Sequence, residues 1–122
     1  MKRNPLLLTL LAAALLVTVS QAQTKIDKDY HHTFTDETKT RQLTFEVPAM
    51  TTKARLRVKM HIKSGKASWG LRDPNGVTRI NGEGRGQINT DTGELEAITG
   101  AWVLEIKLEH ATGSGQVNWS NY

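Results

Sequence analysis

Hydrophobic and polar residues alternate most regularly between residues 53 and 63. Five apolar residues share one parity there, and every residue between them is Lys, Arg or His. Side chains of a β-strand point alternately to opposite faces, so this period of two predicts a half-buried strand with a basic outer face. A helix would scatter both sets of residues around its axis.

Shorter segments repeat the alternation, and we expect strands near residues 29–35, 43–47, 67–71, 77–80, 94–98, 101–109 and 117–119. Turn-forming residues such as Asp73-Pro74-Asn75-Gly76 separate these segments, and the Gly-rich segment 81–93 is expected to be a long loop. The pattern predicts an all-β protein, an antiparallel β-sandwich of about 7–8 strands. Trp69, Trp102 and Trp119 share the parity of their apolar neighbours, so they are expected in the core.

The first 22 residues have a different pattern. Lys2 and Arg3 precede an apolar run at residues 6–19, and Ser20-Gln21-Ala22 supplies small residues for cleavage. This is the pattern of a secretory signal peptide, and the run is shorter than the roughly 20 residues that span a bilayer. We therefore expect a signal peptide at 1–22, a flexible lead-in at 23–29 and the sandwich domain at 30–122. The protein would be periplasmic or extracellular, with no membrane span after cleavage.

The whole-chain composition changes once this leader is set aside. The chain has 122 residues, no Cys and a net charge of +4. The leader holds two of the 16 Lys and Arg and none of the 12 Asp and Glu, so the rest carries +2. Without Cys there is no disulfide framework and no Cys-based zinc site, so packing alone must stabilise an exported domain.

Two segments near the C-terminus resemble a known family. They are Gly100-Ala101-Trp102-Val103-Leu104-Glu105-Ile106 and Gly113-Ser114-Gly115-Gln116-Val117-Asn118-Trp119, preceded by the turn Leu71-Arg72-Asp73-Pro74-Asn75-Gly76. They look like the closing strands and turn of jelly-roll β-sandwich domains of secreted bacterial enzymes, of the pre-peptidase C-terminal and P-domain kind. The resemblance implies a jelly-roll-like sandwich without catalytic residues.

The basic segment is the strongest functional feature of the sequence. Residues 53–66 contain no acidic residue and six cationic ones: Lys53, Arg55, Arg57, Lys59, Lys63 and Lys66. Such a row would bind a polyanion, such as lipopolysaccharide or an acidic glycan. The structural alternatives are an exposed edge strand protected by charge, or pairing with Glu105 and Glu109. No aromatic residue alternates with the cations, which disfavours nucleic acid.

The sequence gives less support to a metal site or a hydrolytic site. Oxygen donors at Asp73, Asn75 and Asp91 are candidates for a structural calcium ion, although the turn by itself explains Asp73. His31 and His32 point to opposite faces of a strand, so they cannot easily share a metal ion, and otherwise we expect no cofactor. Glu94 and Glu96 are the only pair that suggests a hydrolase.

Taken together, the sequence predicts an exported, non-catalytic binding or accessory module. Its partner would be an envelope or extracellular protein or glycan. A polyanion binder that uses residues 53–66 is the first alternative, and a hydrolase is the second.

Overall fold

The computed structural model describes residues 25–122, so the predicted signal peptide lies outside the described residues. The strands are β1 (Ile26–Val47), β2 (Lys53–Arg72), β3 (Thr78–Asp91), β4 (Leu95–Glu96) and β5 (Gly100–Asn121). All pairings are antiparallel, in the order β1-β5-β2-β3, and β4 pairs with the start of β2. Within this described part of the chain, no helix could cross a membrane.

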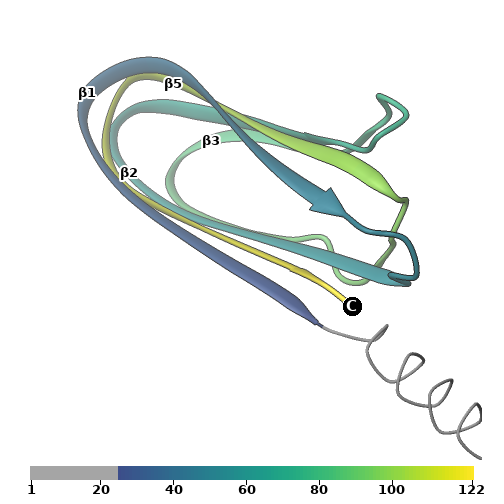
Figure 1. Cartoon of the computed structure of the whole chain (residues 1–122). Helices are drawn as coiled ribbons and strands as arrows, with labels where there is room; N and C mark the ends of the chain where they lie inside the picture. Colours follow the sequence, from purple (N-terminus) through teal and green to yellow (C-terminus); the bar gives the residue numbers. More distant parts are fainter. Residues whose placement is uncertain (1–24) are drawn as a thin grey trace, which may run out of the picture.

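The four long strands bend near their middles, so that one sheet folds over on itself into two layers (Figure 1). Positive φ angles mark the bends: Asp36 in β1 (43°), Gly65 in β2 (76°), Gly86 in β3 (72°) and His110 in β5 (46°). Gly65 is required at its bend, because a Cβ there would lie 2.1 Å from the carbonyl oxygen of His110. The bends create a sandwich from strands that continue through both layers.

This continuity accounts for the difference between five observed strands and the expected 7–8. The expected strands at 29–35 and 43–47, for example, are the two halves of β1. The all-β, antiparallel prediction is confirmed.

Two local expectations were wrong. The expected loop at 81–93 is strand β3 as far as Asp91. Glycine occupies three successive inward positions of β3, at residues 82, 84 and 86, so the alternation was hidden. Gly82 lies directly against the ring of Trp69. The lead-in was expected to be flexible to residue 29, but β1 begins at Ile26 and pairs with the end of β5.

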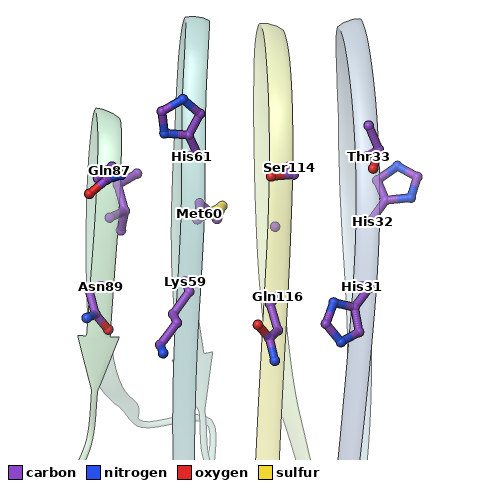
Figure 2. A pocket seen from close by; sticks show the side chains of 12 residues that line it. His31, His32, Thr33, Lys59, Met60, His61, Gln87, Asn89, Ser114 and Gln116 are labelled. Carbon is purple, nitrogen blue, oxygen red and sulfur yellow. The ribbon is translucent and has the colours of Figure 1, made fainter.

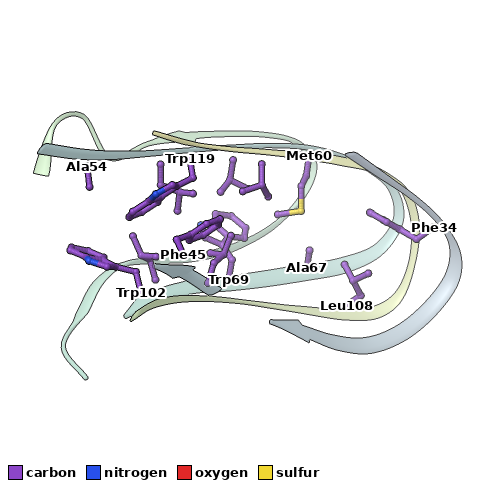
Figure 3. Packing of buried hydrophobic residues seen from close by; sticks show 14 of the residues in the cluster. Phe34, Phe45, Ala54, Met60, Ala67, Trp69, Trp102, Leu108 and Trp119 are labelled. Carbon is purple, nitrogen blue, oxygen red and sulfur yellow. The ribbon is translucent and has the colours of Figure 1, made fainter. Parts of the chain in front are cut away.

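The core lies between the two layers (Figure 3). The Trp119 ring stacks on Phe45 with centroids 4.6 Å apart and planes at 3°, and Trp102 lies beside it at 5.6 Å. Trp102 and Trp119 are fully buried and Trp69 is 8% exposed, so the predicted tryptophan core is confirmed. Burying these rings removes the largest apolar surfaces in the chain from water.

Candidate functional site

Strand β2 runs through the middle of the sheet, between β5 and β3. The apolar side chains of residues 53–63 are buried as predicted, and their basic neighbours face outward. Edge protection therefore does not explain the charges, because β2 has hydrogen-bonded neighbours on both sides.

Asp91, at the end of β3, pairs with two of the predicted cations. Arg55 donates Nε to Asp91 Oδ1 at 2.9 Å and Nη2 to Oδ2 at 2.6 Å, and Arg57 Nε lies 3.4 Å from Oδ2. The hydrogen bonds from Arg55, supported by the N–H of Gly93, hold the pKa of the Asp91 carboxyl well below its usual range. The two-point contact orients the side chains of Arg55 and Asp91, and the cluster with Arg57 keeps one of its two positive charges uncompensated.

The bend at Gly65 divides the four remaining cations of the basic segment between the two layers. Lys66 lies beyond the bend in the other layer, where its Nζ is 3.5 Å from Glu109. The expected pairing with Glu109 thus holds for Lys66, whereas Glu105 pairs with Arg72 at 3.9 Å. Among the described residues, no ion pair involves the three remaining lysines: Lys53, Lys59 and Lys63.

The candidate calcium donors have other partners. Asp73 Oδ1 accepts hydrogen bonds from the N–H groups of Asn75 (2.9 Å) and Val77 (3.1 Å), and Oδ2 accepts one from Arg79 at 3.3 Å. Burial raises the pKa of the Asp73 carboxyl, but these donors outweigh it and the pKa lies below its ordinary value. Asp91 ends β3, whereas Asp73 and Asn75 precede its start.

Within residues 25–122, no cluster of three or more His, Asp or Glu side chains is placed to hold a metal ion. Asp73 instead organises the turn between β2 and β3, as the alternative interpretation of the turn required.

Three adjoining hollows form a groove on the outer face of the layer that contains the first half of β1 and the second half of β5. The largest, about 400 Å³, shares Lys59 and Gln116 with a middle hollow of about 220 Å³. The middle hollow shares Asp29, Arg57 and Asn118 with a terminal hollow of about 330 Å³ that reaches Tyr122. We call the largest hollow the histidine hollow, because His31, His32 and His61 are among the residues that border it.

Cross-strand register sets the lining of the histidine hollow (Figure 2). One row across the sheet consists of Thr33, Ser114, His61 and Gln87, and the next consists of His31, Gln116, Lys59 and Asn89. Successive rows lie about 7 Å apart along the strands, and neighbouring strands lie about 5 Å apart. All eight side chains can form hydrogen bonds, and they come from four different strands.

The charges along the groove are uneven. No Asp or Glu lines the histidine hollow. The middle and terminal hollows contain Asp29, whose Oδ1 accepts a hydrogen bond from Asn118 at 2.9 Å, beside Arg57. One end of the groove is therefore cationic, and the other carries both signs.

Sequence reasoning missed His31 and His61 as groove residues. Parity placed His31 and His32 on opposite faces, and the structure agrees: the His32 ring bonds to Glu37 (3.3 Å) and Arg41 (2.7 Å). His31 is instead brought to the face that carries Lys59 and His61 because β5 inserts between β1 and β2. The sequence shows on which face of its own strand His31 lies, but it does not show the register that aligns β1, β5 and β2.

Glu94 and Glu96 lie outside the groove. Glu94 accepts a hydrogen bond from the hydroxyl of Tyr122 at 2.7 Å, which raises the pKa of that hydroxyl. Glu96 is exposed on β4. Neither lines any of the three hollows.

Comparison with known proteins places the fold. No protein-family model matches the chain, and no curated protein matches it. Among solved structures, it is similar to the pre-peptidase C-terminal domain of a collagenase from Bacillus anthracis, at 15% identity and a TM-score of 0.57. That match covers 77% of this chain and 89% of that one.

The PBSX exported protein XepA is also similar, at 8% identity and a TM-score of 0.51. The match covers 82% of this chain and 37% of that protein. At these identities the likeness shows the fold alone. The predicted resemblance to pre-peptidase C-terminal sandwich domains is confirmed at that level.

Proposed function

We propose that this protein is an exported, non-catalytic binding module that holds a glycan chain along the outer groove. The observation that carries the proposal is the continuity of the three hollows along β5, from Ser114 to Ser120. Six residues of strand rise give the groove a length of roughly 20 Å. An extended ligand, rather than a compact metabolite, matches such a shape.

The lining supports a ligand rich in hydroxyl groups. Side-chain amides of Gln116, Asn118, Gln87 and Asn89 present donors and acceptors in close alternation. A sugar hydroxyl both donates and accepts, so it can satisfy both kinds of group at once. The export part of the proposal rests on the leader pattern at residues 1–22.

The test is binding of the purified protein to a panel of neutral and acidic oligosaccharides, measured by isothermal titration calorimetry. Gln116→Ala, in the middle of the groove, should weaken binding at least fivefold by removing contacts shared by two hollows. Gln42→Ala is the matched control, since Gln42 is an exposed amide in the other layer. Equal effects of the two substitutions, or no binding to any oligosaccharide, would reject the groove.

The non-catalytic part has its own test. The protein should release no product from glycoside or peptide substrates over a prolonged incubation. Turnover that disappears in Glu94→Gln or Glu96→Gln would instead support the hydrolase alternative.

The polyanion alternative uses the whole basic segment. It predicts that lipopolysaccharide binding weakens steeply with salt and falls when Arg55 and Arg57 are both replaced by Ser. The ion pairs with Asp91 oppose it, because a polyanion would have to compete with that carboxylate. Arg57 also lines the middle and terminal hollows, so salt separates the two proposals: the groove proposal predicts that binding of neutral oligosaccharides changes little with salt.

A further inference from the structure

The histidine hollow differs from the rest of the groove in its charge. Its titratable side chains are Lys59 and His61 from β2 and His31 and His32 from β1. Strands β3 and β5 contribute only uncharged lining, from Gln87, Asn89, Ser114 and Gln116 among others. Two of the protein's four histidines, His31 and His61, thus share the outer face with Lys59 in a hollow that no acid lines, and His32 borders it from the opposite face of β1.

Three acidic side chains on the surrounding strands already have partners, and those of Glu37 include His32 at the border of the hollow. Glu37 accepts a hydrogen bond from Arg41 at 2.9 Å, and its pKa is lowered chiefly by that bond. Asp29 bonds to Asn118 in the middle hollow, and Asp91 bonds to Arg55. No carboxylate therefore lines the histidine hollow beside Lys59. Lys59 also borders the middle hollow, which contains Asp29, but among residues 25–122 no ion pair joins these two side chains.

From this arrangement we infer that the histidine hollow binds an anionic substituent, a carboxylate or phosphate carried by one sugar unit of the ligand. The inference rests on the proposed glycan function and names the chemical class of that ligand. Lys59 would contact the anion directly, with hydrogen bonds from the amide of Gln116 and the hydroxyl of Ser114 on the neighbouring strand.

Two histidines lie beside Lys59 on the outer face, His31 on β1 and His61 on β2. An imidazole N–H can donate a hydrogen bond, so both rings can support an anion that Lys59 holds. His32 contributes less, because its ring already forms hydrogen bonds with Arg41 and Glu37.

The experiment compares sugars that differ only in charge. Calorimetry with trigalacturonate and its methyl ester measures the contribution of the carboxylate. Galactose 6-phosphate and galactose form the phosphate arm. We expect the charged member of at least one pair to bind at least fivefold more tightly.

Matched variants locate the effect. Lys59→Gln should abolish the preference for the charged sugar, whereas Lys63→Gln should keep it; Lys63 faces outward on the same strand and lines none of the groove hollows. Circular dichroism and thermal melting confirm that each variant folds.

Each of the other possible results refutes either the anionic subsite or the glycan groove. Equal binding of charged and neutral sugars refutes the anionic subsite and leaves the glycan groove standing. Equal loss in Lys59→Gln and Lys63→Gln assigns the effect to general attraction by the basic strand and refutes the subsite. If no member of either pair binds, the subsite is refuted; Gln116→Ala on the wider oligosaccharide panel then decides the groove separately.

Discussion

Replacing Gly82 by Ala tests whether residues 81–91 form an ordered strand that packs against the core at Trp69. A Cβ at this position would lie 2.6 Å from Cζ2 and 3.0 Å from Cε2 of Trp69, well inside contact distance. Trp69 is itself packed in the core with 8% of its surface exposed, so its ring has little room to move. Overpacking of this kind costs about 1–3 kcal/mol.

Gly84→Ala supplies the matched control. Gly84 lies two residues further along the same strand, and a Cβ there would meet Ile88 at 3.5 Å, an ordinary contact. Both substitutions gain about 0.5–1 kcal/mol from the lower backbone entropy of Ala in the unfolded chain. The difference between the two variants, about 1–3 kcal/mol, therefore isolates the clash with Trp69.

Urea denaturation followed by tryptophan fluorescence measures this difference. In thermal melting, each kcal/mol corresponds to about 4–8 °C for a domain of this size. Replacing Trp69 by Leu should remove most of the penalty of Gly82→Ala, because the clashing ring is then absent. If the two glycine variants agree within about 0.5 kcal/mol, the contact between Gly82 and Trp69 is refuted.

Two further predictions concern the core and the pair at the end of β3. Trp119→Phe removes the buried hydrogen bond from Nε1 to Asn121 Oδ1 (2.9 Å) and should cost about 1–3 kcal/mol for the orphaned acceptor alone. Trp119→Phe should cost less stability in an Asn121→Leu background, because the acceptor is then absent. Urea denaturation measures both costs, and additive effects of the two substitutions would contradict the hydrogen bond. The pKa of Asp91 is lowered in the folded state by Arg55, so the pair stabilises the protein fully above the unfolded pKa of about 3.9 and less as the pH falls below it. The stability advantage of the native protein over Asp91→Asn should therefore be constant from pH 7 to 5 and decline toward pH 2; an advantage that grows on acidification would contradict the assignment.

The outward and inward faces of β2 could be predicted from the sequence. Period-two alternation depends only on strand geometry, because each side chain must point opposite to its neighbour. The same rule assigned the three tryptophans to the core and separated His31 from His32. It failed for β3, because Gly82 and Gly84 have no side chain to mark the buried face.

The candidate site required information that alternation does not contain. Arg55 and Asp91 are 36 residues apart, and their pairing depends on how far β3 extends along β2. Lys59 and His31 lie on one face only because β5 is placed between their strands with one particular register. Strand order and register come from turns, bends and the packing of the whole sheet, and no local pattern encodes them.

The sequence by itself determined that the protein is an all-β chain with a basic outer strand face and a tryptophan core. The tertiary structure decided which of those cations remain available. The bend at Gly65 moved Lys66 into the other layer, and the end of β3 brought Asp91 against Arg55 and Arg57. A residue's parity is a property of its own strand, whereas its electrostatic partners lie on neighbouring strands, so only the folded sheet could single out Lys59 within the groove.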